Sequence, residues 1–79
     1  MYKRFLTYDL NNGSSEDYQD LYDLMDKYHA KQITESTYQI ETSEDWQIFK
    51  TKILKVTHQG DNVKAIIRTG KSIEVRTIR

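Results

Sequence analysis

Apolar and polar side chains alternate along residues 2–10, which is the pattern of a strand with two different faces. One face carries Arg4, Leu6, Tyr8 and Leu10, and the other carries Lys3, Phe5, Thr7 and Asp9. From residue 18 to residue 28 the apolar side chains recur at helical spacing, and acidic side chains fall on the opposite side. These patterns predict a strand, a turn at Asn11-Asn12-Gly13, and an amphipathic helix that Ser14 or Ser15 caps.

Residues 31–42 hold no helical period and are rich in β-branched side chains. They could form one long strand, or two short strands joined near Glu35-Ser36-Thr37, and we favour two strands. A second helix should follow, capped by Thr42 or Ser43. Its inner stripe would consist of Trp46, Phe49, Ile53 and Val56.

The last third of the chain predicts a β-hairpin. Gly60-Asp61-Asn62 should end the second helix, and two alternating runs, 62–68 and 71–78, then flank Thr69-Gly70. The order of elements is therefore β-α-β-β-α-β with the last β element extended into a hairpin. This order predicts an α+β fold of the ferredoxin-like type, a sandwich in which two helices cover one face of an antiparallel sheet.

A chain of 79 residues is long enough for one small core, so we expect a single domain over residues 1–79. Two helices on one face leave the other face of the sheet open, and the alternation places Phe5 and Thr7 there. In small proteins a second copy commonly covers such a face. We therefore expect a homodimer whose interface includes Phe5 and Thr7.

The composition excludes several classes of site. The chain has no cysteine, so disulfides, thiolate metal sites and a cysteine nucleophile are excluded, and a reducing compartment is favoured. No apolar run approaches the length of a membrane span, and the N-terminal residues lack the apolar stretch of a signal peptide. We expect a cytoplasmic protein without a membrane partner.

The formal net charge is zero, from 12 basic and 12 acidic side chains, but the charges are segregated along the chain. Residues 14–30 carry five acidic residues against Lys27, a net −4, and residues 50–79 carry eight basic residues against two acidic ones, a net +6. The neutral total argues against an indiscriminate polyanion binder. The basic half still permits a local phosphate-binding patch at Arg68, Lys71 and Arg76, unless the two charged halves simply attract each other.

Few residues in this chain point to catalysis. No nucleotide-binding loop, nucleophile elbow, zinc-protease helix or EF-hand loop is present, and His29 and His58 have no metal-binding partner at helical spacing. Asp9 is unusual because strand interiors disfavour aspartate. Its carboxylate could cap the turn that follows, or it could serve in a site at the end of the strand.

A dimer would change what Asp9 can do. One carboxylate is a poor metal site, but a two-fold axis would bring Asp9 of both chains together. Two carboxylates could then share Mg²⁺ or Mn²⁺ with a phosphate, and the metal could support hydrolysis of a phosphodiester.

Residues 2–60 also resemble a known group of proteins. The resemblance is carried by Tyr8-Asp9-Leu10-Asn11, Asp17-Tyr18, Leu21-Tyr22, Ala30 and the segment 35–42, Glu-Ser-Thr-Tyr-Gln-Ile-Glu-Thr. On these residues the chain is similar to small bacterial and phage proteins often labelled SinR-like. Those in turn resemble the small nuclease of CRISPR spacer acquisition and the virulence-associated protein D ribonucleases.

This resemblance implies a ferredoxin-like fold, a homodimer, and an aspartate at the end of the first strand that acts in metal-dependent cleavage of RNA or DNA. Asp9 matches that aspartate, and Ser36 matches a serine of the same group. The leading hypothesis is thus a homodimeric endonuclease with catalytic Asp9 and Ser36, acting on RNA in preference to DNA in a CRISPR, toxin–antitoxin or phage-defence setting. The alternative is a non-catalytic dimeric adaptor that contacts a protein or a nucleic acid through its sheet edge and basic C-terminal strands.

Overall fold

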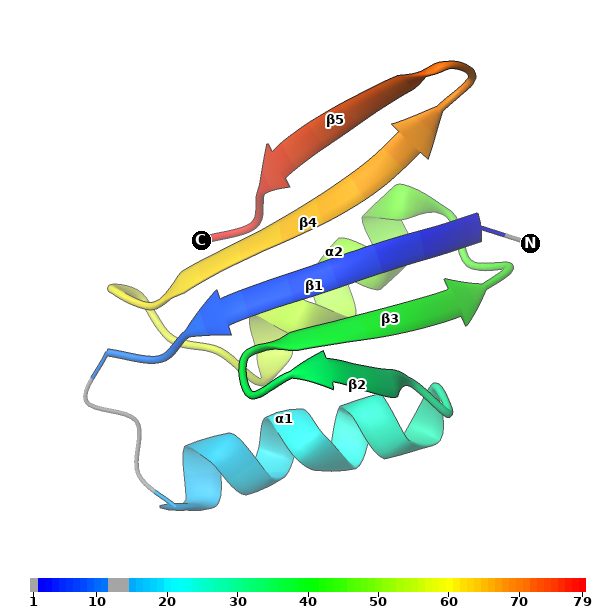
Figure 1. Cartoon of the computed structure of the whole chain (residues 1–79). Coiled ribbons are helices and arrows are strands. Elements are labelled where there is room, and N and C mark those ends of the chain that lie inside the picture. The colour runs from blue at the N-terminus through cyan, green and yellow to red at the C-terminus, as the bar shows by residue number, and fades with distance from the viewer. Residues whose placement is uncertain (1, 12–14) are drawn as a thin grey trace.

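A computed structural model of the chain describes residues 2–11 and 15–79, apart from the side chain of Thr69. Within these residues the chain forms five strands and two helices (Figure 1). Their order is β1 (Tyr2–Asp9), α1 (Ser15–Lys27), β2 (Lys31–Thr34), β3 (Thr37–Thr42), α2 (Trp46–Lys55), β4 (Asn62–Thr69) and β5 (Ser72–Thr77).

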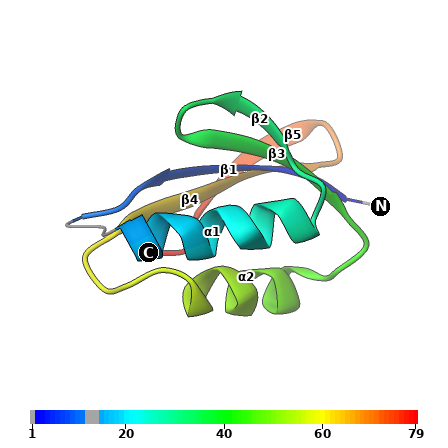
Figure 2. The same ribbon diagram turned by 90° about the horizontal axis from the view of Figure 1, so that it is seen from below.

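The five strands form one sheet in the order β2-β3-β1-β4-β5, and every neighbouring pair is antiparallel. The first strand of the chain is therefore the central strand, where Leu6 faces Tyr38 of β3 and Ala65 of β4 across the two ladders. Both helices lie on one side of the sheet (Figure 2). The α+β class, the antiparallel sheet and the helices on a single face are confirmed.

The core lies between the sheet and the helices. The predicted alternation of β1 is confirmed, because Leu6, Tyr8 and Leu10 are buried and Phe5 and Thr7 on the other face are only half-buried. The largest fully buried side chains come from both helices and three strands: Phe49, Leu6, Leu21, Met25, Ile40, Ile53 and Val63. Each such side chain contributes about 1.5–3 kcal/mol relative to leaving it exposed, so this layer holds the helices on the sheet.

The C-terminus of α1 is closed by a left-handed residue. His29 has φ 53°, its N–H donates to the carbonyl of Asp26 at 3.0 Å, and the N–H of Ala30 donates to the carbonyl of Met25 at 3.0 Å. These two bonds form a Schellman motif, in which glycine is the usual left-handed residue. His29 thus ends α1 through its backbone rather than through its imidazole.

The predicted cap of the second helix is wrong. Thr42 is the last residue of β3, where it pairs with Tyr2, and its hydroxyl accepts a hydrogen bond from the N–H of Glu44 at 3.1 Å. The cap is Asp45, which is extended (φ −71°, ψ 170°) and accepts from the N–H of Ile48 at 3.0 Å. Strand pairing with β1 uses Thr42 in the sheet, so the helix begins later than the sequence pattern predicts.

The two-strand interpretation of residues 31–42 is confirmed, with Glu35 and Ser36 in the turn between β2 and β3. The predicted hairpin of β4 and β5 is present, and Gly70 in its turn has φ 59°, a conformation that favours glycine.

The Asn12-Gly13 part of the predicted first turn and the cap at Ser14 lie outside the described residues. Neither α1 nor α2, the helices of the described part, is long and apolar enough to cross a membrane.

Candidate functional site

Asp9 is the last residue of β1 and lies opposite Asn62 of β4. The strand alternation places it on the open face, together with Phe5 and Thr7, and its side chain is exposed. Across residues 2–11 and 15–79, no hydrogen bond or ion pair engages its carboxylate. Asp9 is therefore available to a ligand.

The turn after β1 is held by a different aspartate. Asp61, only 5% exposed, accepts a hydrogen bond from the N–H of Asn11 at 2.9 Å through Oδ1. Its Oδ2 accepts from the N–H of His58 at 2.8 Å. Asp61 therefore holds the Asn11 end of this turn, and both interpretations of Asp9 stay open because the rest of the turn lies outside the described residues. Sequence reasoning missed Asp61, which looked like an ordinary turn residue after Gly60.

Ser36 lies at the same end of the sheet as Asp9. The N–H of Tyr8 donates to the carbonyl of Ser36 at 3.1 Å, and the Tyr8 hydroxyl donates to the carbonyl of Glu35 at 3.1 Å. These bonds join the β2–β3 turn to the end of β1. Ser36 is exposed, so the two residues predicted as catalytic both lie at the same solvent-facing end of the sheet.

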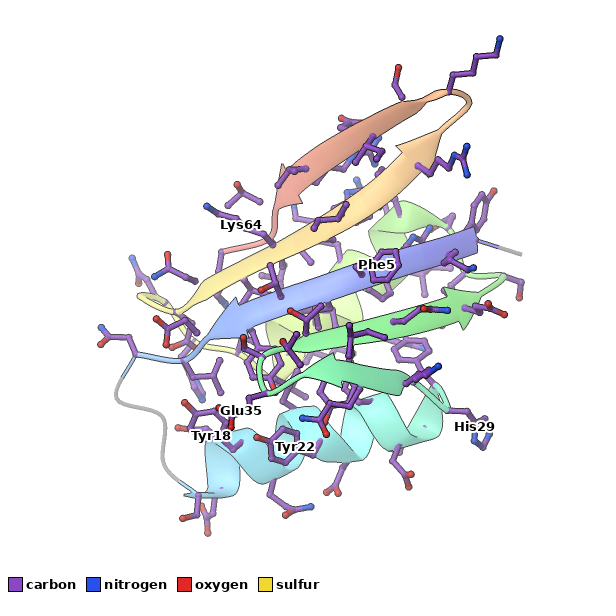
Figure 3. The ribbon with its side chains drawn as sticks, in the orientation of Figure 1. Phe5, Tyr18, Tyr22, His29, Glu35 and Lys64 are labelled. Atoms are coloured by element: carbon purple, nitrogen blue, oxygen red, sulfur yellow. The ribbon has the colours of Figure 1, made fainter. Side chains whose placement is uncertain are left out.

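A tyrosine cluster packs beneath this end of the sheet, on the side of the helices. Tyr8 stacks on Tyr38 with ring centroids 6.2 Å apart, and Tyr22 of α1 lies 6.4 Å from Tyr38 and 6.1 Å from Tyr18. Burial raises the pKa of Tyr8 above its ordinary value, and a hydrogen bond with Tyr22 raises it further. Figure 3 shows the Tyr18 and Tyr22 rings beside Glu35 at this end of α1. Tyr8 connects the cluster to the β2–β3 turn through its hydrogen bond to the Glu35 carbonyl.

Asp9 is the acidic side chain that the sequence predicts as a metal ligand at this end of the sheet. No group of three or more histidine, cysteine or acidic side chains that could hold a metal ion occurs among the described residues. Mg²⁺ is usually held by one or two carboxylates together with phosphate and water. Asp9 supplies one carboxylate, and a second copy of the chain would supply another.

The three cations predicted to bind nucleic acid gather around the β4–β5 hairpin but do not share one face. Arg68 lies opposite Ile73 on the open face, and Lys71 lies in the turn. Arg76 lies opposite the buried Ala65 and so belongs to the helix side, where its guanidinium is 4.9 Å from the centroid of the Trp46 ring. The hairpin turn is at the opposite end of β4 from Asn62, so Arg68 and Lys71 lie far from Asp9 of the same chain.

The open face carries an apolar stripe, which we define as Phe5, Ile66, Ile73 and Val75. Phe5 is opposite Ile66, and Ile66 is opposite Val75, so the stripe crosses three strands. Ile73 is 75% exposed and Val75 is 60% exposed. Figure 3 shows Phe5 and Lys64 on the side of the sheet that is turned away from the helices. The predicted dimer residue Phe5 thus belongs to a larger apolar surface, and Thr7 lies next to it along β1.

Comparisons with protein-family models, with curated proteins and with solved structures gave no match for this chain. The resemblance of residues 2–60 to SinR-like proteins therefore stays a prediction, and the function has to be argued from the residues themselves.

Proposed function

We propose that this chain forms a homodimeric, metal-dependent endoribonuclease in which Asp9 of two copies binds Mg²⁺ or Mn²⁺. The observation that carries the proposal is the exposed carboxylate of Asp9 on the open face, at the same end of the sheet as Ser36. Within the described residues this carboxylate has no hydrogen bond or ion pair. A strand-end aspartate that holds no turn and pairs with no cation has no structural task among the described residues, and it is the kind of ligand that Mg²⁺ prefers.

The arrangement of elements supports a ferredoxin-like fold for the first four strands and both helices. The connections β1-α1-β2 and β3-α2-β4 each pass over one intervening strand, which is the split β-α-β pattern of that fold. β5 would then be an addition at the outer edge of β4. Such a fold agrees with the proposed relation to SinR-like proteins and their nuclease relatives.

The apolar stripe supports the dimer. A strand surface on which Ile73 and Val75 are more than half exposed is costly to leave in water, and an isologous contact would cover it. Asp9 lies on this same face of the sheet, four residues from Phe5 along β1. A two-fold axis across the face can therefore place two Asp9 side chains near each other.

In this mechanism the metal would neutralise a phosphate oxygen and lower the pKa of a bound water. The two Asp9 carboxylates would hold the metal. The Ser36 hydroxyl would hydrogen-bond a phosphate oxygen of the RNA, and the hairpin cations would hold phosphates further along the strand.

The test is a cleavage assay on single-stranded RNA with Mg²⁺ or Mn²⁺, with and without a chelator. Wild type should cleave only with the metal, and Asp9→Asn should lose activity by about 100-fold or more, because a neutral amide is a weak metal ligand. Asp20→Asn removes another exposed acid, on α1, and should retain activity. Equal cleavage by Asp9→Asn and wild type would contradict the proposal.

The second candidate is a non-catalytic adaptor, and the position of the cations favours it. Arg68 and Lys71 border the apolar stripe, whereas Asp9 lies at the other end of β4. If wild type shows no metal-dependent cleavage but binds RNA, and Lys71→Gln weakens that binding, the adaptor replaces the nuclease.

A further inference from the structure

Arg4 is a buried cation with an unusual environment. It is 4% exposed on the helix-facing side of β1, and its guanidinium carbon lies 4.9 Å from the Tyr2 ring centroid, 5.9 Å from that of Trp46 and 4.8 Å from that of Phe49. Its Nη1 atom is buried and has no hydrogen-bond partner within the described residues. Burial lowers the pKa of Arg4 from its ordinary value, although nearby Tyr2, Tyr28 and Glu44 oppose this effect.

The aromatic packing explains only part of why this position holds arginine. The three rings attract a cation, but an unbonded buried N–H is costly, and an apolar side chain of similar length would avoid that cost. A guanidinium that keeps unused donors in a buried position is therefore better explained by a ligand that accepts from it.

The acidic groups nearest Arg4 already have other partners. Glu44 accepts from Lys52 and from the Tyr28 hydroxyl, and Glu74 pairs with Arg76 at 3.3 Å. Asp45 faces the same hollow, but one of its oxygens accepts from the N–H of Ile48 as the cap of α2. Glu44 therefore compensates part of the Arg4 charge, but no acidic side chain of the described residues accepts a hydrogen bond from the buried Nη1.

A hollow of about 440 Å³ opens beside Arg4. A second guanidinium, Arg76, lines it from β5, and Lys3 and Arg68 also line it. Tyr2 and Trp46 supply aromatic surface, and the Tyr2 side chain is 55% exposed. The hollow therefore combines a basic wall with an aromatic one, at the end of the sheet opposite Asp9.

We infer that this hollow binds the phosphate monoester of a nucleotide, with Arg4 and Arg76 on the phosphate and Tyr2 beside the base. Two guanidinium groups suit a dianionic phosphate better than a single carboxylate. The volume exceeds that of a free ion, and the exposed ring offers a surface on which a base can stack. The site is independent of the proposed cleavage at Asp9, and it takes either a free nucleotide or the phosphorylated end of an RNA strand.

The single tryptophan makes the test direct. Trp46 is the only tryptophan of the 79 residues and it lines the hollow, so its fluorescence reports on binding there. Wild type should show a saturable change with adenosine 5′-monophosphate, a weaker one with inorganic phosphate, and none with adenosine or acetate. A 5′-phosphorylated oligoribonucleotide that binds better than its 5′-hydroxyl form would identify a strand end as a ligand.

Two variants separate binding from folding. Arg76→Gln, at a partly exposed position on β5, should weaken nucleotide binding by about tenfold or more, because a charge-assisted hydrogen bond is lost. Lys64→Gln removes a cation from the open face and should bind like wild type. Arg4→Met should abolish binding while the melting temperature is unchanged or higher, because an unpaired buried charge is removed.

Three results would overturn the inference. The first is a Trp46 fluorescence that shows no saturable change with adenosine 5′-monophosphate up to about 10 mM. The second is an equal nucleotide affinity of Arg76→Gln and Lys64→Gln, and the third is acetate binding as tightly as the nucleotide. Because Asp9 has no part in these measurements, a failure here leaves the cleavage proposal unaffected, and a failure of the cleavage assay leaves this site unaffected.

Discussion

The buried carboxylate of Asp61 accepts a hydrogen bond from the N–H of Asn11, 50 residues earlier in the chain, at 2.9 Å. Its second oxygen accepts from the N–H of His58 at 2.8 Å. One side chain thus joins the segment that leaves the central strand to the loop that follows α2. Asp9, two residues before Asn11, has no hydrogen bond or ion pair within residues 2–11 and 15–79.

Asp61→Ala should lower the free energy of unfolding by about 3 kcal/mol, because two backbone N–H groups lose a charged acceptor. Asp61→Asn should lose about half as much, since one acceptor oxygen remains. Urea unfolding followed by circular dichroism measures both changes. Asp20→Ala, at an exposed position of α1, should stay within about 0.5 kcal/mol of wild type. A loss below about 1 kcal/mol for Asp61→Ala would show that water replaces the carboxylate.

His29→Gly should stabilise the protein by about 0.5–1 kcal/mol, because His29 has φ 53° at the left-handed position of the Schellman motif. His29→Ala is the matched control. Alanine keeps the Cβ atom that makes this conformation unfavourable, so it should bring no gain. Thermal unfolding of the three proteins ranks them, and a stabilised alanine variant would locate the cost in the imidazole instead.

The pKa of Glu44 predicts an acid-sensitive contribution to stability. Burial raises this pKa, but hydrogen bonds from Lys52 and Tyr28 outweigh burial and lower the pKa below its ordinary value. A carboxylate with a lowered folded-state pKa stabilises the protein above its unfolded-state pKa of about 4.3. This contribution is lost as the pH falls through the folded-state pKa.

Glu44→Gln should therefore be less stable than wild type near neutral pH, and the difference should shrink below about pH 4. Urea unfolding at several pH values gives the comparison. Glu41→Gln removes a carboxylate from an exposed pair with Lys3 at 3.9 Å and should change little at any pH. A Glu44→Gln deficit that stays constant on acidification would assign its effect to packing.

Wild type should have the mass of two chains by light scattering at micromolar concentration, and Val75→Lys should shift it toward one chain. Val75 is 60% exposed, so lysine there need not disturb the core, but each chain would bring a charged side chain into the apolar contact. Ile48→Lys alters an equally apolar, 48% exposed side chain on α2 and should remain dimeric. A wild-type monomer at this concentration would contradict the dimer.

Periodicity predicted the elements of this fold well, because the signal for each lies within the element. The alternation of β1 correctly assigned Leu6 to the core and Phe5 to the open face. The caps were predicted less well, because they depend on strands distant in sequence. Pairing with Tyr2 draws Thr42 into β3, and this moves the cap of α2 to Asp45.

The candidate sites show the same division. The open-face position of Asp9 follows from its place in an alternating strand. The environment of Arg4 does not follow from sequence pattern, because Trp46 and Phe49, which surround it, come from a helix more than 40 residues later. Alternation could have separated Arg68 from Arg76. Arg68 pairs with Ile73 across the hairpin, and Arg76 is three residues after Ile73, so the two arginines lie on opposite faces of the sheet.

The central position of β1 has a consequence for synthesis on the ribosome. β1 emerges before the other elements, but its partners β3 and β4 follow about 35 and 60 residues later. Until then the strand exposes unpaired N–H and carbonyl groups next to Leu6 and Phe5, which another nascent chain can pair with. A chaperone that holds β1 during translation should therefore raise the yield of folded protein more than one that acts after release.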